Sequence, residues 1–172
     1  MSKIIDGKKI AERVKDKITK EIIQIKKRTN LAIVLLEGRS DSELYVSLKE
    51  KEAKKVGIDT HLYKCASSIS EKELLETIEY LNKDTLIDGI LVQLPLPESI
   101  NADKIVSAVL ATKDVDGFHP DNLAKIKKGE KFIVPPVYAA IFEMLTDIKA
   151  DLKYKRVCII TNSEIFGGNL AQ

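Results

Sequence analysis

The sequence predicts an α/β fold in which a mostly parallel sheet is covered by helices on both faces. Two observations predict this class: apolar runs without alternation, at residues 31–36 and 89–93, and amphipathic segments between such runs. Continuous apolar runs suit parallel strands that are buried on both faces. Regular alternation of strand and helix is typical of a parallel sheet with crossover helices. The 172 residues suffice for one complete core and part of a second domain.

The first half of the chain supplies most of these elements. A lysine-rich segment over residues 8–28 repeats Ile and Val at three- and four-residue steps, which predicts an amphipathic helix. It is followed by strand 31–36, helix 41–56, strand 59–65, helix 71–81 and strand 89–93. Gly57 stands where a left-handed cap would end the second helix. Ser70 and Glu73 have the spacing of a capping box for the third.

The second half is more helical and ends in one further strand. A helical pattern runs from Asn101 through Ile105 to Val109, and another from Ala139 to Leu145 after the break at residues 135–136. Residues 157–160 are predicted to form a strand that opens into a turn, similar to the first strand and turn of a Rossmann unit. The chain stops soon afterwards, at Gln172.

Composition and charge exclude several classes of function. The chain is 44% apolar and 31% charged, as in ordinary globular proteins, and its net charge of +2 is spread without a basic cluster, so no nucleic-acid partner is predicted. No run approaches the roughly 18 to 20 apolar residues of a membrane span, and residues 1–6 lack the apolar region of a signal peptide. A cytoplasmic location is therefore expected. No Cys or His has metal-ligand spacing, so no metal is predicted.

Two polar residues stand out against their surroundings. Gln93 ends a buried strand just before the stiff segment Leu94-Pro95-Leu96-Pro97, and ligands of open α/β sheets bind outside the carboxyl ends of strands. Tyr45 and Lys49 are four residues apart on one helix face, where a lysine can take part in proton transfer. The simpler interpretations are a core strand with a rigid exit and a solvated helix face.

Asp114 and Asp116 flank Val115 in a loop that closes at Gly117. Since alternate residues of an extended loop point in opposite directions, one carboxylate can enter a pocket while the other accepts hydrogen bonds from backbone N–H groups. The simpler interpretation is an ordinary turn.

Three segments together resemble a known enzyme family. They are Tyr45-Val46-Ser47-Leu48-Lys49, Asp88 to Pro97 and Lys113-Asp114-Val115-Asp116-Gly117-Phe118-His119-Pro120. In this order and at these intervals they closely resemble the bifunctional methylenetetrahydrofolate dehydrogenase/methenyltetrahydrofolate cyclohydrolase family. The resemblance runs from residue 4 to about residue 168. It implies a folate-binding catalytic domain of the aminoacid dehydrogenase-like type over residues 1–147 and the first strand of an incomplete Rossmann domain over residues 148–172.

The resemblance also implies roles for individual residues. Lys49 is the catalytic lysine, Tyr45 stacks on or orients the folate, and Gln93 pairs with Lys49. Asp116 binds the pterin, whose adjacent N–H donors a carboxylate can accept in bidentate fashion. Ser42 and Pro97 are implied to line the same pocket, and Ser163 and Gly167 to contact the cofactor. Tetrahydrofolate derivatives are the implied ligands, and the family is homodimeric.

Two reactions are implied by the family. Hydride transfer from methylenetetrahydrofolate to NADP or NAD gives a methenyl cation, and addition of water then gives 10-formyltetrahydrofolate. This chain departs from the family at Pro135-Pro136-Val137-Tyr138, which adds an aromatic ring at the cleft, and at Thr161, where the cofactor turn lacks its first glycine. The cofactor is therefore not expected to bind to the chain as it stands. The alternative is a folate-binding or interaction module that needs a partner domain.

Overall fold

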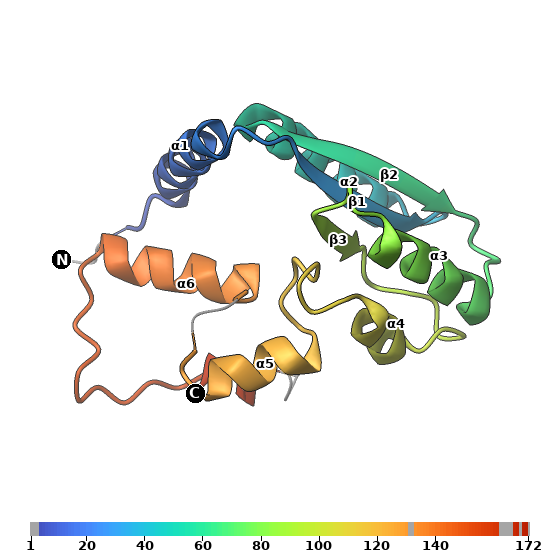
Figure 1. Ribbon diagram of the computed structural model, residues 1–172. Helices are drawn as coiled ribbons and strands as arrows, with labels where there is room; N and C mark the ends of the chain where they lie inside the picture. The colour runs from blue at the N-terminus through green and yellow to red at the C-terminus, as the bar shows by residue number, and fades with distance from the viewer. Residues whose placement is uncertain (1–3, 131–132, 162–166, 169, 172) are drawn as a thin grey trace.

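The computed structural model describes residues 4–130, 133–161, 167–168 and 170–171. Within them a sheet forms from β1 (Thr29–Leu36), β2 (Ile58–Cys65) and β3 (Gly89–Val92), in the order β2-β1-β3 with both pairs parallel. The helices are α1 (Gly7–Ile25), α2 (Ser40–Val56), α3 (Glu71–Lys83), α4 (Ala102–Ala108), α5 (Pro120–Lys127) and α6 (Pro136–Asp147) (Figure 1). The predicted α/β class with a parallel sheet is confirmed. None of the helices described here is both long and apolar enough to span a membrane.

The central strand β1 is buried on both faces, which explains why its apolar run does not alternate. Alternate residues of β1 join two separate clusters. Ala32, Val34 and Leu36 pack with the apolar side chains of α3 and α4, whereas Ile33 and Leu35 pack with Val46 of α2. Fully burying one such aliphatic side chain contributes roughly 1.5–3 kcal/mol. Helices therefore cover both faces of the sheet, as predicted from the sequence.

Helix ends follow the local signals in the sequence. Gly57 caps α2 with a φ of 91°, in the left-handed region where a glycine is favoured. Ser70 and Glu73 form the predicted capping box, because each side chain accepts a hydrogen bond from the other residue's backbone N–H. The last helix, α6, begins at Pro136, three residues before its predicted start at Ala139. A proline is tolerated there because the first helical N–H groups have no intrahelical partner.

One prediction about the second half of the chain was wrong, and one helix there was not predicted. Residues 157–160 are not in a strand, since in the part of the chain that is described no strand lies beside them to complete a hydrogen-bonded ladder. The helix α5 was missed, although its start carries the usual signals. The side chain of His119 accepts a hydrogen bond from the backbone N–H of Asp121, and Pro120 stands in the first turn.

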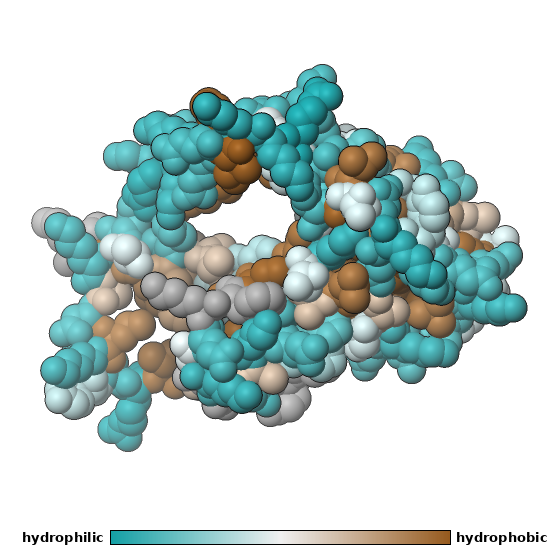
Figure 2. Space-filling view, in the orientation of Figure 1, coloured by the Kyte–Doolittle hydropathy of each residue, from teal (hydrophilic) through white to brown (hydrophobic). Residues whose placement is uncertain are grey.

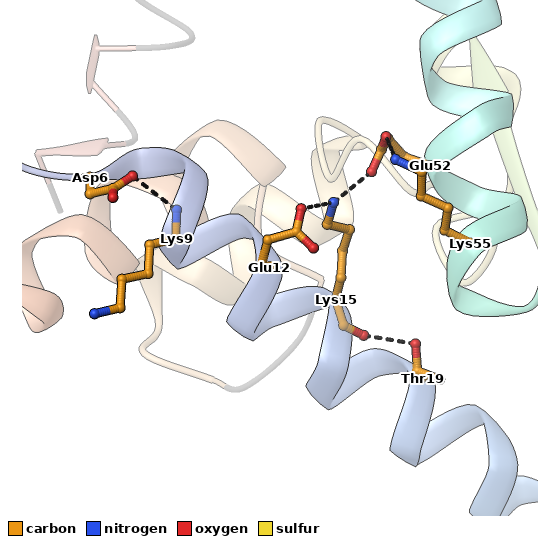
Figure 3. Close-up of polar contacts among 7 residues, drawn as sticks. All are labelled: Asp6, Lys9, Glu12, Lys15, Thr19, Glu52 and Lys55. Atoms are coloured by element: carbon orange, nitrogen blue, oxygen red, sulfur yellow. Dashed lines mark hydrogen bonds and ion pairs between the residues drawn. The ribbon is translucent and has the colours of Figure 1, made fainter.

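The helices α1 and α6 lie apart from the sheet and are linked to each other by Arg13, whose guanidinium pairs with Asp147 at 2.8 Å and Glu143 at 3.7 Å. Figure 2 shows the molecule hollowed between these two helices and the sheet layer. Nζ of Lys15 in α1 donates a hydrogen bond to Oε2 of Glu52 in α2 at 2.8 Å (Figure 3). This ion pair joins α1 to the α/β core.

Glu52 should make the attachment of α1 sensitive to acid. Hydrogen bonds from Lys15 and Lys55 lower the pKa of its carboxyl from 4.5 to about 2. Because the folded-state pKa is depressed, the stabilisation is present above pH 4.5 and is lost as the pH falls towards 2. We expect the melting temperature of Glu52→Gln to fall less than that of the wild type between pH 5 and pH 3. Glu21→Gln, which alters an exposed pair within α1, serves as control; parallel pH curves for Glu52→Gln and wild type would contradict this role.

Candidate active site

The candidate site lies where β1 and β3 end. Gln93 directly follows β3, and its backbone N–H still donates to the carbonyl of Val34 at 2.9 Å, which holds it in line with the sheet. Its side-chain Nε2 donates to the carbonyl of Leu94 at 2.6 Å, and its Oε1 accepts from Nζ of Lys49 at 2.9 Å. The first of these bonds fixes the orientation of the amide, so that its oxygen faces the lysine.

Helix α2 carries Lys49 to this amide. Val46, which is 1% exposed, anchors the helix on the sheet, and Lys49 follows it by three residues on the adjoining turn. Lys49 is partly buried. Tyr45, four residues before Lys49, is 61% exposed and can stack on a flat ligand. The predicted contact between Lys49 and Gln93 is therefore present, with an open aromatic ring one helical turn away.

The two aspartates of the 114–117 loop make different contacts. Asp114 is 3% exposed and accepts hydrogen bonds from the backbone N–H groups of Gly117 and His119, at 3.0 and 2.8 Å. Both aspartates line a cavity of about 620 Å³ between β3, α4 and α5, and Asp116 accepts no hydrogen bond from the described residues there. The carboxylate of Asp114 thus holds the loop, and that of Asp116 is left facing the cavity.

Asp116 is partly buried, and within the described ranges its carboxylate has no hydrogen-bond partner. Burial raises its pKa, Lys49 opposes that increase by attraction, and the charge of Asp114 adds to it. A partly desolvated carboxylate without a partner gains most from a ligand that brings N–H donors. The charge of Lys49 thus acts on Asp116, although neither Lys49 nor Gln93 lines the cavity beside it.

The other predicted site residues are placed differently. Ser42, in the first turn of α2, is 3% exposed and is thus covered in this structure, whereas Pro97 is exposed in the loop after β3. Neither lines the cavity beside Asp116. Ser163 lies outside the described residues. Gly167 is buried, and a Cβ there would approach Cγ2 of Thr161 to 2.2 Å.

The described residues do not make up a complete dinucleotide site. Binding the pyrophosphate in a Rossmann unit needs a strand, a glycine turn and a helix start in succession. Residues 157–161 form no strand, and the turn that would follow them, at residues 162–166, lies outside the described residues. Among the described residues there is also no group of three or more His, Cys, Asp or Glu side chains arranged to hold a metal ion.

Asn122 is the polar residue near the site that sequence reasoning missed. It is 0% exposed, and its Nδ2 donates to Asp114 at 3.0 Å and to the carbonyl of Ala111 at 2.9 Å. The start signals of α5 at His119 and Pro120 could have predicted the helix. They could not have predicted that its third residue turns inward, because that depends on how α5 packs.

Comparison with known proteins gives a consistent result. Residues 5–116 match the family described as tetrahydrofolate dehydrogenase/cyclohydrolase, catalytic domain. The bifunctional protein FolD of Geotalea daltonii is 41% identical over 174 residues, which cover 99% of this chain and 62% of that protein. The chain spans about three fifths of the length of the curated relatives it matches.

Solved structures agree in fold. A 5,10-methylenetetrahydrofolate dehydrogenase from the silkworm Bombyx mori superposes with a TM-score of 0.94 at 34% identity, over 99% of this chain and 60% of that one. The Trypanosoma brucei methylenetetrahydrofolate dehydrogenase-cyclohydrolase was solved with NADP and an inhibitor. It superposes with a TM-score of 0.92 at 27% identity, over 99% of this chain and 60% of that one. With its match over more than half its length and the sheet-edge site described above, the chain belongs to the tetrahydrofolate dehydrogenase/cyclohydrolase family.

Proposed function

We propose that the chain binds a reduced folate at the Lys49, Gln93 and Asp116 site and catalyses the cyclohydrolase reaction, in which methenyltetrahydrofolate and water give 10-formyltetrahydrofolate. The observation that carries this proposal is the 2.9 Å contact of Lys49 with Gln93, together with the attraction of Lys49 on the partly buried carboxylate of Asp116, which has no hydrogen-bond partner among the described residues. The first pair can move a proton and the second group can hold a pterin, so binding and chemistry are provided at one sheet edge.

The cyclohydrolase reaction needs a water molecule and a group that accepts and donates protons. The oxygen of water bonds to the methenyl carbon and loses one proton. The bond from that carbon to one ring nitrogen then breaks and the nitrogen takes up a proton, while the second proton leaves the oxygen as the formyl C=O forms, so that one proton is released overall. Lys49 can accept or donate at this point because Gln93 occupies one of its hydrogen-bonding positions and holds its Nζ in place. Asp116 fixes the pterin through its N–H donors.

The dehydrogenase reaction of the relatives is a property of longer proteins. The nicotinamide cofactor would supply a hydride acceptor. NADP or NAD is the group implied by the family, and the Trypanosoma brucei relative was solved with NADP. Since the described residues do not make up a complete dinucleotide site, we assign no residue of this chain to hydride transfer.

The proposal is tested with the purified chain and 5,10-methenyltetrahydrofolate, by following the absorbance of the methenyl compound. We expect decay faster than in buffer alone. A parallel assay with methylenetetrahydrofolate plus NADP or NAD measures the dehydrogenase reaction. Silence in the first assay would contradict the cyclohydrolase proposal, and binding of the folate without turnover would favour the alternative of a binding module.

Gln93 should matter for rate more than for affinity. Gln93→Ala removes the acceptor that holds Nζ of Lys49, so we expect turnover to fall by about tenfold or more while folate affinity changes little. Gln93→Glu keeps an acceptor and adds a charge, and it should shift the pH dependence of turnover. The measurements are steady-state turnover and folate binding at several pH values. Equal losses of turnover and affinity in Gln93→Ala would point to a general distortion of the site.

A further inference from the structure

Asp114 is a buried carboxylate that accepts hydrogen bonds from three directions. The backbone N–H groups of Gly117 and His119 and the side-chain amide of Asn122 all donate to it, at 2.8 to 3.0 Å. The amide orientation of Asn122 follows from this, because the opposite orientation would set its oxygen against the carboxylate and against the carbonyl of Ala111. The three donors tie the loop to the start of α5.

The residues around Asp116 are each fixed by a separate contact. Nζ of Lys113 donates to the carbonyls of Leu81, Asn82 and Asp84, where α3 ends. Val115 packs closely on Gly89: a Cβ added at Gly89 would lie 2.5 Å from Cγ1 of Val115. Gly117 has a φ of 71°, and a Cβ added to it would lie 2.8 Å from the backbone nitrogen of Pro135. Asp116 is the residue of this segment whose side chain is left for a ligand.

We propose that Asp114 is a positioning residue for folate binding: its carboxylate closes the 114–119 loop and thereby aims Asp116 into the site. This inference rests on the proposed function, because it takes the ligand of Asp116 to be a pterin. Asp114 itself does not touch the substrate. It acts through the direction of the loop and through its charge beside Asp116.

The charge of Asp114 gives the proposal a measurable signature. The groups that act on Asp116 are Lys49 of α2, which lowers its pKa, and Asp114, which raises it; Asp103 of α4 and Lys127 of α5 line the same cavity. Folate affinity should fall as the pH drops through the raised pKa of Asp116, since protonation removes the acceptor. Without the charge of Asp114 the pKa of Asp116 is lower. The loss of folate affinity in acid, called the acid limb of the curve of affinity against pH, then moves to lower pH.

The experiment measures binding of 5,10-methenyltetrahydrofolate to the purified chain from pH 4 to pH 8, for wild type, Asp114→Asn and Asp116→Asn. An asparagine at position 114 replaces one carboxylate oxygen by an NH2 group, which faces a donor and cannot accept its hydrogen bond. At least one of the three hydrogen bonds to residue 114 is therefore lost. We expect Asp114→Asn to bind about tenfold to a hundredfold more weakly at pH 7.5, with its acid limb at lower pH than that of the wild type. Asp121→Asn, an exposed change at the start of α5, is the control and should bind as the wild type does.

Each outcome decides between the two proposals. If wild type binds and Asp116→Asn binds weakly, but Asp114→Asn matches the wild type or keeps the same acid limb, the positioning role is wrong while the proposed function stands. If Asp114→Asn does not fold, Asn122→Ala decides, because it removes one of the three donors from outside the loop. A weaker affinity then supports the role of Asp114, and a wild-type affinity overturns it. Failure of the wild type to bind overturns the proposed function itself, and this inference with it.

Discussion

Replacing Lys49 by methionine is expected to lower cyclohydrolase turnover by about a hundredfold to ten-thousandfold, the usual contribution of a general acid or base. Methionine is unbranched and close in length to lysine, so it keeps the packing of α2 against the sheet while removing the group that moves the proton. Gln93 then loses the donor to its Oε1. Turnover is measured from the absorbance of 5,10-methenyltetrahydrofolate, and binding of the same compound is measured separately.

The matched control is Lys51→Met, which removes a lysine from the same helix at an exposed position. It should leave both turnover and the melting temperature close to those of the wild type. If Lys49→Met retained the wild-type rate, Lys49 would have no catalytic role. If Lys49→Met and Lys51→Met lost activity equally, a general effect of charge on α2 would be the explanation.

Much of the fold could be predicted from the sequence because its signals are local. The unbroken apolar run of β1, the cap at Gly57 and the capping box at Ser70 each depend on a few neighbouring residues, and all three are present as predicted. The strand expected at residues 157–160 needed a partner strand, which a local pattern does not reveal. The helix α5 was missed because its turns pack through Asn122, a polar residue, and no apolar stripe marks it.

The position of several site residues could be predicted from the sequence, but their burial could not. Sequence spacing placed Tyr45 and Lys49 on one helix face and Gln93 at a strand end, and the structure brings Lys49 and Gln93 together. The burial of Ser42 could not be read in this way, because it depends on the docking of α2 on the sheet. Alternation along an extended loop predicted that one of the two aspartates would accept backbone hydrogen bonds, and Asp114 does so, from Gly117 and His119.

The departure from the family at residues 135–138 acts in a way that the sequence did not indicate. We expected the aromatic ring of Tyr138 to be added at the cleft. Its side chain is instead 1% exposed, and its ring meets that of Phe118 edge to face, with 6.3 Å between the centroids. Phe118 stands two residues after Asp116, so the change reaches the site through the packing beneath the loop.

Asp116→Asn is expected to weaken folate binding and to stabilise the free protein. The asparagine keeps the shape of the side chain but turns one acceptor into a donor, so a pterin loses a charge-assisted pair of hydrogen bonds and affinity falls by about tenfold to a hundredfold. Stability changes in the opposite direction. Burial raises the pKa of Asp116 above 3.8, so its ionised form is less favourable in the folded chain than in the unfolded one.

The sign of the stability effect follows from this shift. For a carboxyl whose folded-state pKa is raised, stability is greatest below pH 3.8 and decreases as the pH rises through the folded-state value. Melting temperatures of wild type and Asp116→Asn should therefore be similar at pH 3 and separate with rising pH, the variant being the more stable at pH 7. The exposed carboxylate of Asp103, on the same cavity, provides the control, and Asp103→Asn should show no such separation. A variant that lost affinity and stability together at pH 7 would make Asp116 a structural residue, because only a group kept for a ligand is expected to destabilise the free protein.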